Sequence, residues 1–550
     1  MKKCLPLLMI LGVLTSCFLP DRTVSAAGYQ DALVETLKKG PSTALNLNTH
    51  GRKAADIDIK LSELYHGHNL EPFWIENGKC DIRGSQILSV LTDAGSHGLD
   101  PADYFVKKIG HFWNKTDTVS LVRLDVLLTL GMMRYVADQQ EGRIQPYQID
   151  PELFAAASDI EVDWNVLMKA AFNAPDMKTF LEQQAPPFIQ YRALQKKLAD
   201  YRIIAAIGGW PSIPTGEVLK PGMTDQRIRT LRKRLAVTAD LSAADIDSSE
   251  FDPALEEAVK KFQKRHHLGS DGVVGKQTLD AMNIPVGTRI QQIIINMERY
   301  RWLKRSIMDD RLVAVNIAGF EAVAGRPGNF DVRTPVIVGK PYHKTPVFND
   351  TIKHVVFNPF WTLTPSIARN ETLPELKKDP LYLEKNDMRL FQGWDADSPE
   401  LDPAAIDWSQ VSKQNMNKYR VRQDPGPNNA LGTLKIIFPN KYHVYLHDTP
   451  AHSLFKQKKR AFSHGCIRMA RPAEMAAWVL GGEKNGWDLA RIKKIIAERK
   501  RHIEVLDQPV PIYILYRTTY VNPGDETLYF HEDIYGRDKL LASALFAPNR

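Results

Sequence analysis

The chain of 550 residues is too long for one hydrophobic core, and its length predicts three or four domains. Hydrophobic residues make up 43% and charged residues 25% of it, which is ordinary for globular protein and excludes disordered and fibrous classes. The net charge of +8 is scattered along the chain. Such a mild excess is compatible with an anionic cell wall and is too weak to indicate a nucleic-acid partner.

Residues 1–26 have the pattern of a secretory targeting segment, in which two lysines precede a short apolar run over 5–13. The run is too short to cross a bilayer as a permanent helix. Two processing sites remain open. The residues before Cys17 resemble a lipobox, which would place a lipid on Cys17 and tie the protein to a membrane, whereas Val24-Ser25-Ala26 resembles an ordinary cleavage site. Either route predicts a mature protein in the periplasm or cell envelope.

Two cysteines follow this segment, Cys80 and Cys466. An oxidising compartment would permit a bridge between them. Because Cys466 is the candidate nucleophile described below, and a nucleophilic thiol must stay free, we predict no structural disulfide.

From 27 to 222 the sequence predicts a helical, irregular domain with few strand signals. One apolar stripe at helical spacing runs from Leu124 to Tyr135, and another runs from Tyr191 to Tyr201. Several prolines and glycines over 211–222 then predict a linker. We assign no chemical role to this region.

Residues 223–286 predict a small all-α module. Two apolar stripes, over 228–235 and 255–262, indicate two packed helices. The segment resembles the peptidoglycan-binding module through a phrase that reads Phe262-Gln263, then Asp271-Gly272-Val273-Val274-Gly275, then Thr278-Leu279. The resemblance implies wall binding, and the alternative is a structural spacer.

Residues 287–307 predict a linker helix, and 308–500 predict a β-rich domain that the last segment, 501–550, completes. Strands are expected over 312–318, 333–338, 352–357, 434–438, 442–446 and 512–520. A charged insertion at about 369–427 interrupts the domain, with helix expected at 373–378 and around 403–408. Long insertions near catalytic strands are often lids, and the alternative is a rigid decoration.

The stretch 441–469 carries the residues with the clearest chemistry. Alternation from Tyr442 to Leu446 predicts a half-buried strand, so His447 should lie at a strand end. Cys466 follows in a glycine-containing loop, before a helix that starts near Pro472. An imidazole beside a thiol takes its proton and raises the reactive thiolate fraction. The pattern therefore predicts a cysteine nucleophile with a histidine base.

Neighbouring residues would support this pair. The Asp448 backbone carbonyl or side chain is the nearest acceptor for the other ring nitrogen of His447. Gly465 allows the N–H groups of Gly465 and Cys466 to point at an oxyanion. Arg468 could fork onto a substrate carboxylate.

A zinc site made of His447, His464 and Cys466 is the competing interpretation of the same residues. No CxxC or HExxH pattern accompanies them, and the other mature cysteine is distant in the chain. We predict no metal.

His447 followed by Ser463-His464-Gly465-Cys466-Ile467-Arg468 resembles the signature of the L,D-transpeptidase catalytic domain, also called the YkuD domain. Upstream matches are Val338-Gly339-Lys340, Thr345-Pro346, Phe357-Asn358-Pro359-Phe360-Trp361, Pro365-Ser366-Ile367-Ala368 and Asn429-Ala430-Leu431-Gly432. The resemblance implies that Cys466 is the nucleophile, His447 the base and Asp448 its orienter, with His464 and Gly465 in the oxyanion wall. The candidate substrate-binding residues are Arg468, Ser463, Tyr445, Trp361 and Asn429.

Region 27–222 resembles the helical scaffold of large Gram-negative L,D-transpeptidases, in which an insertion such as 369–427 caps the substrate cleft. The expected fold is therefore an α+β multidomain protein: a β-rich catalytic domain, a helical scaffold domain and a small all-α peptidoglycan-binding module. The resemblance implies a cysteine-dependent transpeptidase that needs no cofactor, acts in cell wall biogenesis and cell shape, and is acylated by carbapenems. Its expected partners are peptidoglycan stem peptides and other wall synthases, with no nucleic acid.

By this resemblance, Cys466 forms a thioester with a tetrapeptide stem and releases the terminal D-Ala. The acyl group then passes to the diaminopimelate amine of a second stem, which joins the two third residues. Three alternatives stay open: hydrolysis of the thioester by an L,D-carboxypeptidase or endopeptidase, attachment of a lipoprotein to peptidoglycan, and a non-catalytic wall-binding protein.

Overall fold

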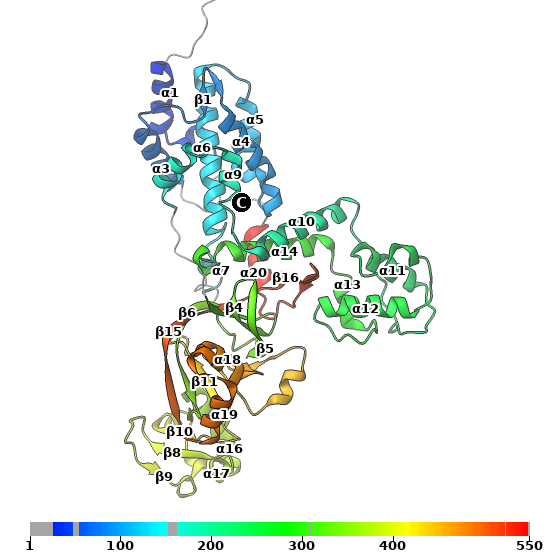
Figure 1. Cartoon of the computed structure of the whole chain (residues 1–550), viewed down its shortest axis with the longest axis vertical. Helices are drawn as coiled ribbons and strands as arrows, with labels where there is room; N and C mark the ends of the chain where they lie inside the picture. Colours follow the sequence, from blue (N-terminus) through cyan, green and yellow to red (C-terminus); the bar gives the residue numbers. More distant parts are fainter. Residues whose placement is uncertain (1–25, 48–53, 152–161, 309–310, 523, 548–550) are drawn as a thin grey trace, which may run out of the picture. The chain divides into compact units, whose positions relative to one another are not determined.

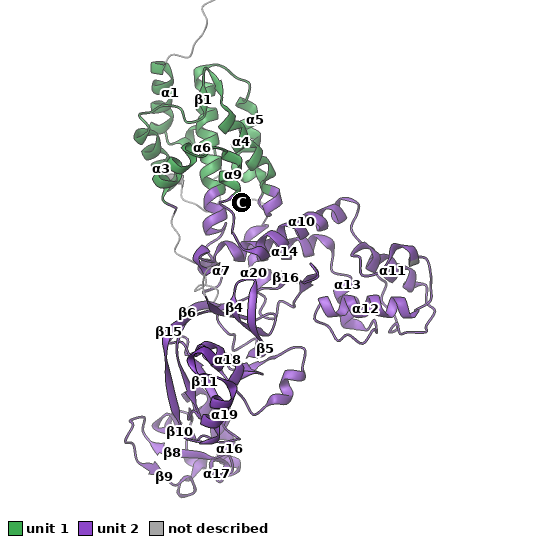
Figure 2. Ribbon diagram, in the orientation of Figure 1, with its two compact units in different colours: residues 1–94, 100–135, 163–182 green, residues 95–99, 136–162, 183–550 purple. Residues whose placement is uncertain are grey.

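The computed structural model describes residues 26–47, 54–151, 162–308, 311–522 and 524–547 (Figure 1). The processing signals around Cys17 lie outside the described residues. The chain divides into two compact units (Figure 2): unit 1 comprises 1–94, 100–135 and 163–182, and unit 2 comprises 95–99, 136–162 and 183–550. The region predicted as one helical domain, 27–222, is therefore divided between the two units.

Unit 1 is predominantly helical, as its sequence predicts. Its elements are α1 (Ala26–Lys38), α2 (Pro41–Ala44), α3 (Ala54–Gly67), β1 (Ile75–Glu76), β2 (Lys79–Cys80), α4 (Ile82–Thr92), η2 (Pro101–Tyr104), α5 (Val106–Phe112), the first part of α6 (Thr118–Glu141), α8 (Trp164–Phe172) and α9 (Met177–Glu182). The apolar stripe predicted from Leu124 to Tyr135 lies on α6 and is buried.

A fully buried carboxylate lies in the interior of unit 1. Asp125 accepts hydrogen bonds from the Tyr65 hydroxyl at 2.6 Å and from the Trp74 backbone N–H at 2.7 Å. The Trp74 indole N–H donates in turn to the Thr129 hydroxyl at 2.9 Å. Burial raises the pKa of Asp125. Hydrogen bonds satisfy this buried carboxyl group, and among the described residues it forms no ion pair.

The predicted peptidoglycan-binding module is a separate helical cluster within unit 2. It contains α11 (Arg227–Val237), η4 (Ala243–Asp245), α12 (Pro253–Arg265) and α13 (Lys276–Met282), and it has its own hydrophobic core. The Gln263 amide donates to the Asp271 carboxylate at 2.8 Å and to the Val273 carbonyl at 2.9 Å. The Gly272 N–H donates back to the Gln263 side chain at 2.9 Å. The motif residues therefore hold the turn of this module together.

The β-rich part of unit 2 is a β-sheet that closes on itself. Its strands are β3 (Leu312–Asn316), β4 (Glu321–Arg326), β5 (Asn329–Gly339), β6 (Phe348–Phe357), β11 (Leu434–Ile437), β12 (Leu446–His447), β13 (Ala461–Ser463), β14 (Ile467–Met469) and β15 (His502–Leu515). Their order among the described residues is β13-β5-β14-β12-β11-β6-β15-β3-β4, and β4 also pairs with β5. This second pairing closes the sheet into a barrel-like form, so its inward side chains share one core.

Helices and a second small sheet complete unit 2 around this core. They are α7 (Pro146–Ile149), α10 (Ile189–Ala206), α14 (Val286–Arg301), α18 (Pro472–Val479), α19 (Leu489–Ala497), β16 (Thr519–Val521), β17 (Leu528–Phe530) and α20 (Arg537–Leu545). The predicted stripe from Tyr191 to Tyr201 lies on α10, and residues of α14 such as Ile293 and Met297 are fully buried in the same core. The helix predicted as a linker over 287–307 is therefore a core element.

The insertion at 369–427, together with the preceding residues 361–368, forms a subdomain with its own core. Its sheet has the order β7 (Trp361–Thr362), β10 (Tyr419–Gln423), β8 (Met388–Gln392) and β9 (Glu400–Leu401). Its helices are α15 (Pro365–Ile367), a π-helical turn (Ala368–Thr372), α16 (Leu373–Lys378), α17 (Tyr382–Lys385), η7 (Pro403–Ala405), η8 (Trp408–Gln410) and η9 (Asn415–Lys418). The helix predicted at 373–378 is confirmed. The one expected around 403–408 is instead two short 3-10 turns, each capped by an aspartate side chain.

Two predicted strands are interrupted. The segment from Tyr442 to Val444 is a turn, because the Asn440 side chain accepts from both backbone N–H groups and donates to the Val444 carbonyl. The strand predicted over 512–520 is broken after Leu515, because side-chain amides of Asn296 and Asn316 take the next backbone N–H groups.

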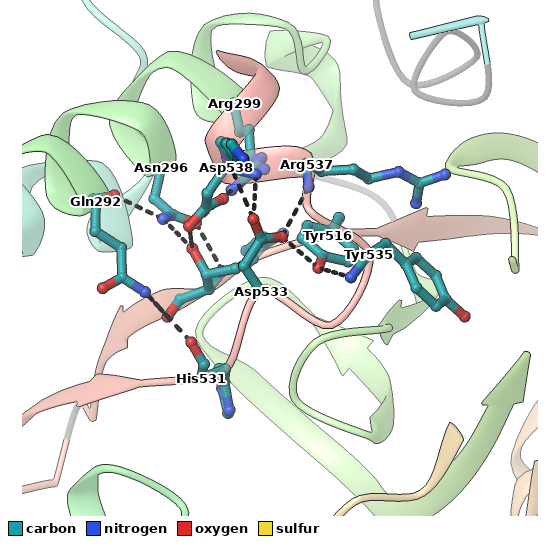
Figure 3. A network of polar contacts seen from close by, with 12 residues as sticks. Gln292, Asn296, Arg299, Tyr516, His531, Asp533, Tyr535, Arg537 and Asp538 are labelled. Carbon is teal, nitrogen blue, oxygen red and sulfur yellow. Dashed lines mark hydrogen bonds and ion pairs between the residues drawn. The ribbon is translucent and has the colours of Figure 1, made fainter. Parts of the chain in front are cut away.

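The segment after β15 is fixed by a polar network, drawn in Figure 3. Asp533 accepts from the Tyr516 hydroxyl at 2.7 Å and from the Arg537 backbone N–H at 2.8 Å. Asp538 forms an ion pair with Arg299 of α14 at 2.6 Å. These contacts anchor α20 and the turn before it to the core of unit 2.

Candidate active site

Three neighbouring strands of the barrel bring the predicted base between two cations. His447 of β12 is the register partner of Lys435 on β11 and of Arg468 on β14. Directly paired residues on adjacent strands lie on the same face of a sheet. The intervening residues, among them Leu446 and Ile467, are fully buried in the core. Lys435, His447 and Arg468 therefore form a row on the opposite face.

The predicted nucleophile lies directly before this row. Gly465 has a φ of 113°, in the region that favours glycine. Its N–H donates to the Ser463 hydroxyl at 3.1 Å, and that hydroxyl donates to the Cys466 carbonyl at 2.5 Å. Ser463 thus fixes the loop from a buried position. An oxyanion contact from the Gly465 N–H requires exchange of this internal hydrogen bond.

The Cys466 thiol is free and largely desolvated. Its sulfur lies 3.7 Å from the His443 carbonyl. Burial raises the pKa of Cys466, and hydrogen bonds from Tyr445 and the charges of Arg468 and Lys435 oppose that rise. The resting group is a neutral thiol that needs a base.

His447 is buried and has a defined tautomer. Its Nδ1 lies 2.6 Å from the Asp448 backbone carbonyl. Because a carbonyl oxygen only accepts, Nδ1 carries the hydrogen and Nε2 keeps its lone pair. Burial, reinforced by the charge of Arg468, lowers the pKa of His447 to about 3. The imidazole is therefore neutral at neutral pH and able to accept a proton at Nε2.

Asp448 supports His447 through its backbone. The Asp448 carboxylate accepts from the Thr433 N–H at 2.8 Å, from the Thr433 hydroxyl at 2.7 Å and from the Thr449 N–H at 2.7 Å. Gly432 packs against this carboxylate: a Cβ at Gly432 would lie 2.4 Å from the Asp448 Cγ. The sequence left two acceptors open for His447, and in the structure its partner is the Asp448 backbone carbonyl. The Asp448 side chain instead holds Thr433, the residue before β11.

His464 contacts the insertion. Its Nε2 lies 2.7 Å from a carboxylate oxygen of Glu371, and its ring centroid lies 5.0 Å from that of His343. The subdomain 369–427 therefore reaches the nucleophile loop, and a place for His464 in an oxyanion wall stays a prediction.

Two predicted substrate-binding residues lie at the base of the insertion. Trp361 is in β7 and packs against the subdomain core. Asn429 is buried and donates both amide hydrogens to backbone carbonyls, those of Pro359 at 3.0 Å and Asp424 at 2.9 Å. In this conformation Asn429 fastens the two ends of the insertion to each other.

Two residues support the nucleophile loop from behind: Thr345, which the sequence marked only within a motif match, and Tyr535, which it did not single out. The Thr345 hydroxyl donates to the Gly465 carbonyl at 2.9 Å. The Tyr535 hydroxyl accepts from the Thr345 N–H at 3.2 Å and donates to the Gly339 carbonyl at 2.6 Å. Tyr535 lies in the turn that the network of Figure 3 anchors. Thr345-Pro346 was a motif signal, whereas nothing local in the sequence marks Tyr535.

Lys435 is also a residue that sequence reasoning missed. Alternation in the strand 434–437 could have placed it opposite the buried Leu434 and Ile436, but its position beside His447 depends on strand register. Within the described ranges no group of three or more His, Cys, Asp or Glu side chains is arranged to hold a metal ion, and no helix is long and apolar enough to span a membrane.

Comparison with family models identifies the class of this site. Residues 310–531 match the model described as "L,D-transpeptidase catalytic domain", 59–198 match "Scaffold domain" and 224–282 match "Putative peptidoglycan binding domain". The chain therefore carries a catalytic domain of the L,D-transpeptidase family, together with a scaffold domain and a peptidoglycan-binding domain.

Individual relatives carry related names. A Haemophilus influenzae protein named "Putative L,D-transpeptidase" is 29% identical over 279 residues, which is 50% of this chain and 54% of that protein. The chain thus spans about half the length of this relative. An L,D-transpeptidase structure from Mycobacterium smegmatis aligns at 16% identity and a TM-score of 0.17, covering 37% of this chain and 58% of the other. An L,D-transpeptidase structure from Xylanimonas cellulosilytica aligns at 14% identity and a TM-score of 0.16, covering 55% of this chain and 99% of the other. At these TM-scores neither alignment bears on function.

Proposed function

We propose that this protein is a peptidoglycan L,D-transpeptidase of the cell envelope. The proposal rests on one observation above others: a neutral imidazole on β12 and a free thiol directly before the adjacent strand β14 lie together in the segment that matches an L,D-transpeptidase catalytic domain. The peptidoglycan-binding domain supports peptidoglycan as the substrate and the cell envelope as the location.

In the first half-reaction, Nε2 of His447 takes the Cys466 thiol proton as the sulfur attacks the carbonyl carbon of the third residue of a tetrapeptide stem. The tetrahedral intermediate collapses as the C–N bond to the terminal D-Ala breaks. His447 returns the proton to the departing amine, and a thioester remains on Cys466. The Cys466 N–H, next to Gly465, is the group we assign to the oxyanion.

In the second half-reaction, the side-chain amine of diaminopimelate in another stem attacks the thioester carbonyl. The amine loses a proton to His447, the C–S bond breaks, and the proton returns to the sulfur. The product is a direct cross-link between two third residues. Because every proton passes through His447, one neutral base serves both halves.

The experiment is mass spectrometry of the purified chain incubated with disaccharide-tetrapeptide, beside Cys466→Ala. We expect a dimer that has lost one D-Ala, formed only by the protein with its thiol, and a carbapenem adduct on Cys466 alone. Shortened tripeptide without dimer would instead establish a hydrolase, and the same dimer from Cys466→Ala would refute the mechanism. Adding a lipoprotein tail peptide tests lysine as the acceptor.

A further inference from the structure

Two cations beside the predicted nucleophile have no carboxylate partner. Lys435 and Arg468 flank His447 across the sheet, and both are half-buried. Among the residues that the structure describes, neither side chain forms an ion pair with an Asp or Glu. The Arg468 Nε is buried without a hydrogen-bond partner. The Lys435 Nζ lies 5.3 Å from the centroid of the Tyr445 ring, a cation–π contact.

Some other buried cations of unit 2 are paired with carboxylates, whereas Arg234 and Arg289 form hydrogen bonds only to neutral groups among the described residues. Arg265 pairs with Asp240 at 2.5 Å, and Arg301 pairs with Glu298 at 2.8 Å. A buried charge without a partner is unfavourable, because desolvation is not compensated by a counter-charge.

The groups that shift the pKa of Lys435 and Arg468 do not include a carboxylate. Burial lowers the pKa of Lys435, and the nearby positive charge of Arg501 lowers it further. His447 is neutral, and the acidic group whose charge would favour both cations is the Cys466 thiol. The face beside the thiol is therefore left positive, as an anion-binding site requires.

We infer that Lys435 and Arg468 together form a carboxylate-binding site beside Cys466. The site takes an acyl donor that carries a carboxylate within a few bonds of the reacting carbonyl. Naming that donor rests on the proposed function: in a tetrapeptide stem, the terminal carboxylate of the departing D-Ala fits this description. Arg468 can fork onto both oxygens, whereas Lys435 acts as a point charge on the other side of His447.

The test compares two alkylating reagents that differ mainly in charge. Iodoacetate carries a carboxylate next to its reactive carbon, and iodoacetamide carries a neutral amide in the same place. Rates of Cys466 alkylation are followed on the full chain by peptide mass spectrometry, which separates Cys466 from Cys80. The measured quantity is the iodoacetate-to-iodoacetamide rate ratio, relative to that of the neutral thiol 2-mercaptoethanol.

We expect the wild-type ratio to exceed that of 2-mercaptoethanol by at least about tenfold, because charged donors form strong hydrogen bonds with a carboxylate. Added salt should lower the ratio. Lys435→Met should lose at least about fivefold of it, and Lys435→Arg should keep most of it. The matched control is Lys353→Met, an exposed lysine on the neighbouring strand β6, which should leave the ratio unchanged.

Several outcomes would overturn the inference. A wild-type ratio no greater than that of 2-mercaptoethanol would do so without any variant. If Lys435→Met slows both reagents equally and shifts the pH profile of alkylation, the cations act on the thiolate alone. The cross-linking assay separates the inference from the proposed function. A high iodoacetate-to-iodoacetamide ratio in a protein that forms no cross-links would support the carboxylate site and contradict the proposed function. Cross-linking with a flat ratio would remove only the inference.

Discussion

The Tyr535 hydroxyl is expected to stabilise the nucleophile loop although it lies outside the matched catalytic domain, which ends at residue 531. It bonds the Gly339 carbonyl at 2.6 Å and the Thr345 N–H at 3.2 Å. Tyr535→Phe keeps the ring and removes both bonds. Two buried backbone groups then lose their partner.

The magnitude follows from these two bonds. A buried polar group left unsatisfied costs about 1–3 kcal/mol, so the variant should lose about 3 kcal/mol of unfolding free energy in this domain. For a domain of this size, 1 kcal/mol corresponds to about 2–4 °C, so the melting temperature should fall by about 10 °C. Because Thr345 also holds the Gly465 carbonyl at 2.9 Å, hydrogen exchange over 461–469 should become faster.

The assay combines differential scanning calorimetry with peptide-resolved hydrogen exchange. The matched control is Tyr529→Phe, since Tyr529 stacks on Tyr520 at 5.1 Å and its hydroxyl forms no hydrogen bond among the described residues. This variant should change the unfolding free energy by no more than about 0.5 kcal/mol. A loss in Tyr535→Phe no larger than in Tyr529→Phe, with unchanged exchange at 461–469, would refute the proposed support of the loop.

Two further predictions concern the base and the insertion. Burial lowers the pKa of His447 from 6.5 to about 3. Between these two pH values the unfolded chain binds a proton at this residue and the folded chain does not, so the folded state loses stability as the pH falls from 6.5 toward 3. His447→Gln should therefore lose less stability than wild type between neutral pH and about pH 4.5 in urea unfolding, and equal losses would contradict the buried neutral imidazole. The contact of Glu371 with His464 is partly exposed and should contribute no more than about 1 kcal/mol of stability. Glu371→Ala should therefore speed limited proteolysis within 369–427 by up to about fivefold. An unchanged proteolysis rate would show that this contact does not hold the insertion in place.

The sequence alone determined those features that depend on neighbouring residues. Helix α16 forms at Leu373–Lys378, and α18 begins at Pro472, because apolar spacing and a proline at the first turn act within one segment. The pairing of a histidine strand end with a cysteine loop was likewise encoded in one short stretch, 441–469.

Local pattern was misleading where a distant or irregular hydrogen bond took precedence. The alternation from Tyr442 to Leu446 predicts a strand, yet the Asn440 amide takes the backbone groups and only Leu446–His447 joins the sheet. Propensity cannot foresee this result, because one side chain satisfies the same N–H groups that a ladder would use.

Only the tertiary structure decided which groups surround the thiol. Lys435 lies beside His447 because of the register between β11 and β12, and Tyr535 reaches the loop through Thr345 from the end of the chain. Register and long-range hydrogen bonds depend on how whole strands align, since a shift by one residue would turn Lys435 to the opposite face. The candidate nucleophile and base are therefore predictable from the sequence, whereas their electrostatic surroundings depend on the closed sheet.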